Sequence, residues 1–347
     1  MIRGSVVLED RFKAESEGLV KSWQRYDRAV LRDYLVGGPE DPRTNVQSIL
    51  TRHFLIERLF GRRFEALADA ELRFAIVAAW LRKLVLSSNG QQQLGLVLDA
   101  LLDGAGHAGE ITIPNYVGET FGLLPHEILG LHIPNYINEV LMSLPPESVN
   151  VPLSESVMNT FAGVWKDALK DARADVISVL EPACGSANDY RFIHRFGIAR
   201  FLDYHGFDIC AKNIANAQGM FPGVSFAVGN VLEIDRGDKS FDYCYVHDLF
   251  EHLSLEAMGR AFEEIMRVTR KGVCCGFFNM RTGTEHFEVP VEDYHWNTLS
   301  MPRIRSLLEH YACRAETIAI DSYLRQHFQC PDTHNKQAWT IIATMTT

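Results

Sequence analysis

The pattern of hydrophobic and polar positions divides the chain into two parts with different periods. Over the first 150 residues, apolar residues recur every three or four positions, which predicts amphipathic helices. Beyond that point, short apolar runs rich in β-branched residues alternate with amphipathic stretches, a pattern typical of parallel α/β units. We therefore expect a mostly helical N-terminal domain over residues 1–150 and an α/β domain over residues 151–347, joined by a hinge at Leu144-Pro145-Pro146.

The periodicity of the first part predicts four long helices, over residues 12–34, 46–64, 70–86 and 93–102. A short echo follows, because IPNYVGE at residues 113–119 resembles IPNYINE at residues 133–139. Proline is favoured in the first turn of a helix, so we interpret the echo as two similar helix starts. The helical part could close over a cleft as a lid, with Tyr116 and Tyr136 as substrate walls, or form a dimer interface, and both roles stay open.

One stretch of the second part has the order of elements found in nucleotide-binding α/β units. Residues 176–180 are apolar and β-branched, which predicts a buried parallel strand, and Glu181 follows them. A loop of small residues comes next, then a helix capped by Asn188 or Asp189, then a second strand that ends at Asp208. This order of strand, tight turn, helix, strand and acid is the first half of such a unit.

The loop of this unit indicates which nucleotide it binds. A dinucleotide site needs G-x-G-x-x-G, so that backbone amides can surround a pyrophosphate at the start of a helix. This loop keeps one glycine, Gly185, and has the carboxylate of Glu181 at its entrance, which would repel a pyrophosphate. A ligand with an amino group and a positive centre, such as S-adenosylmethionine, suits it better. Asp208 follows Gly185 by roughly the 20 residues expected between the loop glycine and an acceptor of ribose hydroxyls. A dinucleotide-dependent dehydrogenase is the nearest alternative.

The segment resembles motif I of the class I S-adenosylmethionine-dependent methyltransferases, whose usual form is acid-x-Gly-x-Gly-x-Gly. Here the motif is Glu181-x-Ala183-x-Gly185-x-Ala187, with alanine at two of the glycine positions. Later segments resemble the family's further motifs in the right order, and the resemblance spans about residues 155–347. These segments are 207–218, 224–235, 241–254 and 263–279, the last with a predicted turn at Lys271-Gly272.

The resemblance implies that S-adenosylmethionine is the cofactor and S-adenosylhomocysteine the product. It implies that Asp208 accepts both ribose hydroxyls, that Asn230 and the amide of Val231 hold adenine, and that the segment from His247 faces the methyl group. The implied cofactor-binding residues are Glu181, Ala183, Gly185, Asn188, Asp208, Ile209, Asn230, Val231, His247 and Asp248.

The resemblance also implies the fold of the second part. We expect an α/β, doubly wound and mostly parallel seven-stranded sheet whose last strand is antiparallel. We assign the last helix to residues 301–311 and the sixth and seventh strands to residues 315–320 and 338–344, with a loop over residues 325–336. Cys274 and Cys275 are neighbours in the fifth strand, so their side chains should pack on opposite faces of the sheet.

Four histidines are candidates for a general base that removes a proton from a hydroxyl acceptor. Histidine suits this task because its unperturbed pKa is near 6.5. His247 and His252 follow the fourth strand, whereas His286 and His295 lie in the polar, aromatic-rich segment after the fifth, which in the family commonly forms a wall of the acceptor pocket. His247 and His295 are the leading candidates, oriented by Asp248 or Glu251.

A metal site is the alternative role of the residues after the fourth strand. His247, Asp248, Glu251 and His252 could form a carboxylate and imidazole cluster, and some members of the family use a divalent ion. The spacing of the two histidines does not place both on one face of a helix. We therefore expect no metal site.

Composition excludes several other classes of protein. The formal net charge of −10 over 347 residues argues against a general nucleic-acid binder, which needs a basic surface. The longest apolar run, residues 74–81, is too short to cross a membrane, and the first residues do not resemble a signal peptide. Seven cysteines without a CxxC pair indicate reduced thiols and a cytoplasmic location.

The sequence therefore predicts a methyltransferase that acts on a small molecule, at a hydroxyl, in a biosynthetic or glycan-modifying pathway. Two alternatives stay open: an N-methyltransferase that acts on a small amine, and a catalytically silent member of the fold that binds cofactor or a partner. Apart from the small-molecule acceptor, the expected partner is a second copy of the chain, bound through the N-terminal helices.

Overall fold

The computed structural model describes residues 8–23, 41, 43–87, 90–142, 160–311, 313–333 and 335–345. The predicted domain boundary at residue 150 and the hinge at Leu144-Pro145-Pro146 lie outside the described residues. Within the described part, none of the helices combines the length and the apolar character needed to span a membrane.

A seven-stranded sheet forms the centre of the second part, in the order β5-β4-β3-β6-β7-β13-β12. β13 is antiparallel to both of its neighbours, and the other strands share one direction, which confirms the predicted fold. Because β3 lies between β4 and β6, the strand order reverses there, and a crevice is expected beyond the carboxyl ends of these strands. The strands are β3 (Ile177–Pro182), β4 (Leu202–Asp208), β5 (Ser225–Val228), β6 (Phe241–His247), β7 (Thr269–Phe277), β12 (Cys313–Ala319) and β13 (Trp339–Met345).

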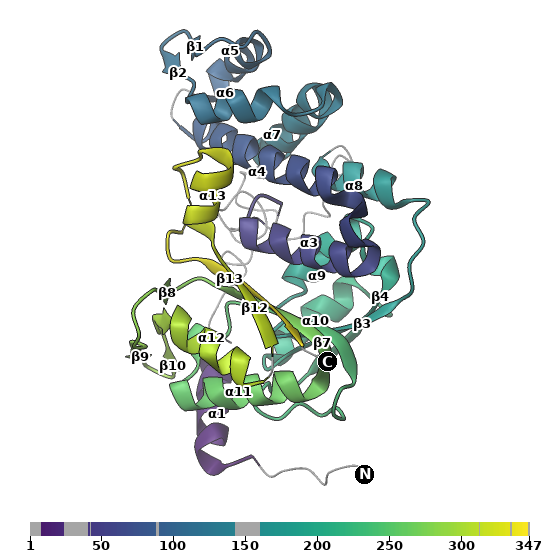
Figure 1. Ribbon diagram of the computed structural model, residues 1–347, viewed down its shortest axis with the longest axis vertical. Helices are drawn as coiled ribbons and strands as arrows, with labels where there is room; N and C mark the ends of the chain where they lie inside the picture. The colour runs from purple at the N-terminus through teal and green to yellow at the C-terminus, as the bar shows by residue number, and fades with distance from the viewer. Residues whose placement is uncertain are drawn as a thin grey trace.

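Helices cover both faces of this sheet (Figure 1). Val179 and Tyr204 pack in one hydrophobic cluster, together with α8 (Phe161–Leu169), α9 (Asn188–Arg195) and α10 (Ala211–Met220). Leu180 packs on the other face with α1 (Asp10–Trp23), α11 (Leu255–Val268) and α12 (Met301–His310). Cys274 belongs to the first cluster and Cys275 to the second, as the alternation of side chains along a strand requires.

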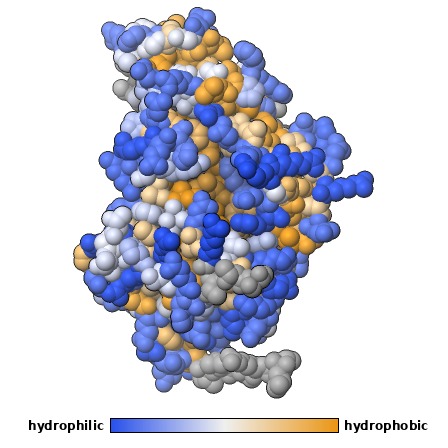
Figure 2. Space-filling model, in the orientation of Figure 1, coloured by the Kyte–Doolittle hydropathy of each residue, from blue (hydrophilic) through white to orange (hydrophobic). Residues whose placement is uncertain are grey.

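The N-terminal helices other than α1 stack beyond one end of the sheet (Figure 1). Their hydrophobic core is continuous with that of the sheet, because Phe54 and Val77 belong to the same cluster as Val179. Figure 2 shows hydrophobic surface gathered where these helices meet the rest of the molecule. The elements are α3 (Val46–Phe60), η1 (Gly61–Phe64), α4 (Glu65–Val85), α5 (Gly90–Leu102), α6 (Asn115–Gly122), η2 (Ile128–His132) and α7 (Ile133–Met142).

α1 lies apart from these helices and packs beside α11 and β10 instead. Its Phe12 and Leu19 are buried in the cluster that contains Leu180. Among the described residues of the N-terminal part, α1 therefore packs with the α/β part and not with α3 to α7.

The remaining short elements connect the main ones. β1 (His107–Ala108) and β2 (Ile111–Thr112) form a small hairpin, as do β9 (Pro290–Val291) and β10 (Tyr294–His295). The segment after β7, which we predicted to form a wall of the acceptor pocket, contains this second hairpin and one parallel pair of short strands. The elements not yet given are β8 (Met280–Arg281), β11 (Leu299–Ser300), η4 (Ala199–Phe201), η5 (Phe250–His252) and α13 (Ile320–Phe328).

The structure corrects three local predictions. α9 begins after Ala187, which has a left-handed backbone and no capping side chain, so neither Asn188 nor Asp189 is the cap. Lys271-Gly272 is part of β7 and makes no turn. The predicted loop over residues 325–336 begins inside α13. The first IPNY segment starts a helix, α6, as predicted, whereas the second follows η2 without a break and lies within a continuous helical stretch.

Candidate active site

The turn between β3 and α9 explains the small residues of motif I. Ala183, Gly185 and Ala187 all have a positive φ, between 53° and 63°. L-residues other than glycine adopt this left-handed conformation at a cost of roughly 1–2 kcal/mol. The alternating glycine positions of the family motif are thus the left-handed positions of this turn, and alanine occupies two of them at a moderate cost.

A cavity of about 390 Å³ opens beside this turn, at the carboxyl ends of β3, β4 and β6. Its volume is within the range of small-molecule sites. All ten predicted cofactor-binding residues line it. The lining residues that the sequence did not indicate as cofactor ligands are Leu19, Cys184, Ser186, Asp189, Phe207, Lys212, Asn213, Gly229, Leu232, Leu249, His252, Leu253, Phe278 and Trp296.

Asp208 fastens the turn to the end of the neighbouring strand. Its Oδ2 accepts a hydrogen bond from the amide of Gly185 at 3.0 Å, and its Oδ1 accepts one from the amide of Cys210 at 2.7 Å and one from Asn213 Nδ2 at 3.3 Å. Burial raises the pKa of this carboxyl, and the three hydrogen bonds oppose that effect. A carboxylate has about four acceptor positions, so capacity remains for a hydroxyl from the cavity.

Glu181 stands at the bottom of the cavity with only 4% of its surface exposed. Its Oε2 accepts hydrogen bonds from the hydroxyls of Tyr204 and Tyr245, each at 2.5 Å. Burial, and next the charge of Asp189, raise the pKa of Glu181 to about 8. A positive charge in the cavity would favour the ionised carboxylate, so the site is suited to a cationic ligand.

The ring of His247 is fixed on both sides. Nδ1 donates to Asp189 Oδ2 at 2.8 Å, and Nε2 lies 2.7 Å from Thr51 Oγ1 of α3. Burial lowers the pKa of His247, but the charge and the hydrogen bond of Asp189 outweigh it and raise the pKa to about 9. Ser48 of α3 donates to the other oxygen of Asp189 at 3.1 Å. His247 is therefore a protonated structural link between α3 and the cavity at neutral pH, a state that cannot accept a proton.

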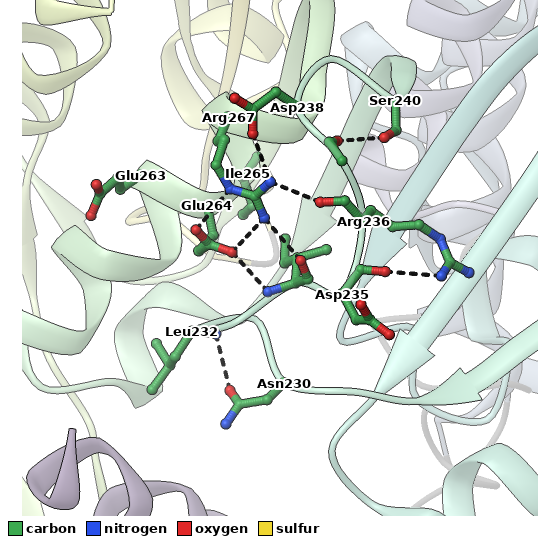
Figure 3. Close-up of polar contacts among 12 residues, drawn as sticks. Asn230, Leu232, Asp235, Arg236, Asp238, Ser240, Glu263, Glu264, Ile265 and Arg267 are labelled. Atoms are coloured by element: carbon green, nitrogen blue, oxygen red, sulfur yellow. Dashed lines mark hydrogen bonds and ion pairs between the residues drawn. The ribbon is translucent and has the colours of Figure 1, made fainter. Parts of the chain in front are cut away.

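The loop after β5 presents Asn230 and Val231 to the cavity. Figure 3 shows how Arg267 of α11 holds this loop: its guanidinium donates to the carbonyls of Ile234 at 2.9 Å and Arg236 at 2.7 Å. Glu264 completes the arrangement by accepting a hydrogen bond from the amide of Ile234 at 2.8 Å. The loop therefore depends on two side chains of a helix more than 25 residues further along the chain.

α1 covers one side of the cavity. Leu19 lines it, and Ser16 Oγ accepts a hydrogen bond from Asn230 Nδ2 at 2.9 Å. Glu15 accepts hydrogen bonds from the amide and hydroxyl of Ser254, each at 2.6 Å, at the start of α11. The Asn230 amide group is thus already bonded within the protein, since its Oδ1 also accepts from the amide of Leu232 at 3.0 Å.

The four candidate histidines occupy different positions. His247 and His252 line the cavity, whereas His286 and His295 do not. His286 Nδ1 accepts a hydrogen bond from the amide of Ser300 at 3.0 Å. The backbone carbonyl of His295 accepts a hydrogen bond from His252 Nδ1 at 3.2 Å. The structure thus brings two of the four to the cavity, and His295 serves to orient His252.

His252 has the properties of a neutral imidazole. Its Nδ1 donates to a carbonyl, which places the proton on Nδ1 and makes Nε2 the basic nitrogen. Burial lowers its pKa below the ordinary value, which favours the uncharged ring at pH 7. It therefore differs from His247, which lines the same cavity in the charged form.

Two rings complete the wall beside His252. Phe278 follows β7, and Trp296 follows β10; their ring centroids are 5.0 Å apart, and each lies within 5.4 Å of the His252 ring. The polar, aromatic-rich character of residues 281–297 pointed to this wall, although not to Trp296 in particular. Nothing in the sequence near Leu19 indicates that it reaches the same cavity.

Tyr116 and Tyr136, the two tyrosines of the helical part that we predicted as substrate walls, lie away from the cavity beside motif I. Tyr136 is fully buried in the core of that part. Tyr116 lines a second cavity, of about 410 Å³, between α4 and α13. Neither tyrosine lines the cavity beside motif I.

The residues present fit S-adenosylmethionine. The left-handed turn at Gly185 leaves no side chain over the cavity there, and a Cβ at Gly229 would come within 3.1–3.2 Å of the Phe207 ring. Glu181 and Asp208 lie at the carboxyl ends of neighbouring strands and line the same cavity, as a cationic nucleoside requires. Among the described residues, no group of three or more His, Cys, Asp or Glu side chains is arranged to hold a metal ion.

Comparison with known proteins agrees with this geometry. Residues 179–272 match the model of a methyltransferase domain. No curated protein matches the chain at the sequence level.

Several solved structures are similar to part of this chain at low identity. An S-adenosylmethionine-dependent methyltransferase from Methanosarcina mazei is 14% identical, with a TM-score of 0.38, over 51% of this chain and 96% of that one. The 1,6-didemethyltoxoflavin-N1-methyltransferase of Burkholderia thailandensis is 15% identical, with a TM-score of 0.39, over 60% and 86%. Likenesses this weak say nothing of the acceptor.

The matched residues 179–272 run from β3, which leads into motif I, to β7. They include most of the residues that line the cavity beside motif I. Residues 179–272 of the chain are therefore similar to a methyltransferase domain.

Proposed function

We propose that the protein transfers the methyl group of S-adenosylmethionine to a hydroxyl of a small molecule, with His252 as the general base. The observation that supports this most is that motif I and a neutral, buried histidine line one cavity. When bound, S-adenosylmethionine supplies a methyl group on a positively charged sulfur, which keeps the electron pair of the broken bond when the methyl group leaves. The protein must then align the acceptor and remove its proton.

The residues of the chain divide these tasks. Glu181 faces the positive charge of the donor, and Asp208 accepts a hydrogen bond from the ribose. Nε2 of His252 takes the proton of the acceptor hydroxyl, while the carbonyl of His295 holds the ring through Nδ1. A positioned base of this kind contributes typically a factor of 10² to 10⁴ in rate.

The N-terminal helices are a fixed part of this site in our proposal, and not a detachable lid. Gln47 of α3 donates to the carbonyls of Phe277 at 2.9 Å and Trp339 at 2.8 Å, at the ends of two central strands. Thr51 and Ser48 fix the pair of His247 and Asp189 from the same helix. A substitution in α3 should therefore affect cofactor binding.

Calorimetric titration with S-adenosylmethionine and S-adenosylhomocysteine tests the proposed function. We expect both to bind, and NADH, which carries a pyrophosphate, not to bind. If neither sulfur nucleoside binds, the result would indicate a silent member of the fold. If only NADH binds, it would indicate a dehydrogenase.

A further inference from the structure

We call the part of the cavity beside the β3–α9 turn its donor half and the part that contains His252 its acceptor half. The acceptor half has an aromatic corner, which we define as the rings of His252, Phe278 and Trp296. The interplanar angles between these rings lie between 36° and 60°, so they meet as the faces of a concave corner and do not stack in parallel. All three line the cavity. Their spacing of 5.0–5.4 Å leaves no room for a ligand between them, so a ligand must lie against their cavity side.

Buried polar groups fix this corner in place. Glu251, which is fully buried, accepts hydrogen bonds from the amides of Phe278 at 2.8 Å and Asn279 at 3.2 Å through Oε1. Asn297, also fully buried, donates to the carbonyl of Leu253 at 2.6 Å and accepts from the amide of Val289 at 3.0 Å. The residues next to each ring are therefore tied to different segments of the chain, and the corner is preorganised.

The chemistry of the corner selects a class of acceptor. Its ring faces, together with Leu249 and Leu253, form an apolar surface suited to a flat aromatic ligand. Its one basic group is the neutral imidazole of His252. A phenolic hydroxyl has a pKa near 10, whereas that of water is 15.7, so an imidazole removes a proton far more readily from a phenol.

We propose, on the basis of the proposed function, that the acceptor is a planar aromatic molecule with a ring hydroxyl. Its ring packs against Phe278 and Trp296, and its hydroxyl lies at Nε2 of His252. The corner thus determines specificity, while the donor half of the cavity is common to acceptors of any shape.

The test uses two probes of similar size and different shape, 2-naphthol and its saturated analogue decahydro-2-naphthol. Their binding is measured by ligand-observed NMR with the full chain, with and without saturating S-adenosylhomocysteine. We expect 2-naphthol to bind about tenfold more tightly than the saturated probe. Equal affinities, or no binding of 2-naphthol, would overturn the proposal.

Substitutions then assign the preference to the corner. Trp296→Ala should weaken 2-naphthol binding about tenfold, and Trp296→Phe, which keeps a ring, less than threefold. Phe287→Ala is the matched control, because Phe287 is an exposed aromatic residue of the same segment that does not line the cavity. A Trp296→Ala variant that retains the preference for 2-naphthol would contradict the assignment.

The affinity for S-adenosylhomocysteine separates this proposal from the proposed function. All three variants should bind it as the wild type does, because none of the substituted residues belongs to the donor half. If the wild type fails to bind it, the proposed function fails. If the wild type binds it but does not distinguish the two probes, only the aromatic acceptor is refuted.

Discussion

The two halves of the cavity are built in different ways. The donor half consists of strand ends and a left-handed turn, so the residues that would contact the cofactor come from short segments directly after β3, β4 and β5. The acceptor half consists of side chains from separate loops, which buried Glu251 and Asn297 tie together. The first arrangement fixes one nucleoside through the backbone, whereas the second can change its specificity by changing a few side chains. The following experiments separate the halves.

The largest effect is expected in the acceptor half. His252→Gln should lower turnover at least a hundredfold, because it removes the base while keeping a polar side chain of similar size. The affinity for S-adenosylhomocysteine should change less than twofold. The measurement is S-adenosylhomocysteine release with a panel of phenols. Turnover equal to that of the wild type would exclude His252 as the base.

The donor half should respond in the opposite way. Asp208→Ala should weaken S-adenosylhomocysteine binding at least tenfold, because the ribose acceptor and the bond to the Gly185 amide are lost together. Asp208→Asn keeps one acceptor oxygen and should lose less. Binding of 2-naphthol to the free protein should stay unchanged, as measured by NMR. Unchanged cofactor affinity in Asp208→Ala would show that the ribose is held elsewhere.

A smaller effect is expected from the support of the donor half. Arg267→Ala removes the hydrogen bonds that hold the loop of Asn230 and Val231, so we expect roughly threefold to tenfold weaker cofactor binding. Arg305→Ala is the control, since Arg305 forms an exposed pair with Glu309, and such pairs contribute little. Calorimetry should distinguish the two variants, and equal affinities would mean that the loop is held without Arg267.

The smallest effect concerns stability and pH in the cofactor-free protein. The pKa of Glu181 is about 8 in the folded state and 4.5 ordinarily, so between these values the folded chain binds a proton that the unfolded chain has lost. The free energy of unfolding therefore falls as the pH rises through this window. The raised pKa values of Glu251 and His247 act in the same direction.

Glu181→Gln should remove the contribution of Glu181 and make the stability less dependent on pH. Urea unfolding at about pH 5.5 and about pH 8.5 measures this, since the wild type should lose more stability between the two than the variant. Equal losses would show that Glu181 titrates normally.

The fold was predicted from the resemblance to the methyltransferase family, and local patterns placed the motif I residues at the ends of neighbouring strands, where they line one cavity. β-branched runs predicted the strands, and the positions of Glu181, Gly185 and Asp208 depend only on where two strands end. Alanine at two left-handed positions did not obscure the motif, because an L-residue can adopt this conformation at a moderate cost and the alanine side chain is small.

The acceptor half and the corrections depend on contacts between distant segments. His247 was a candidate base from its position after β6, but Asp189 and Thr51 of other elements determine that it is charged. The ring of His252 instead donates to a carbonyl from a segment more than 40 residues away. Such partners cannot be predicted from local pattern, and neither could the packing of α1 on the α/β part.

The most direct test of the account is a crystal structure of the protein with S-adenosylhomocysteine. We predict the nucleoside in the cavity beside the β3–α9 turn, with its ribose within hydrogen-bonding distance of Asp208 and its sulfur directed toward the half of the cavity that contains His252. A nucleoside bound elsewhere, such as in the cavity beside Tyr116, or a cavity beside the turn closed by side chains in the crystal, would contradict the assignment.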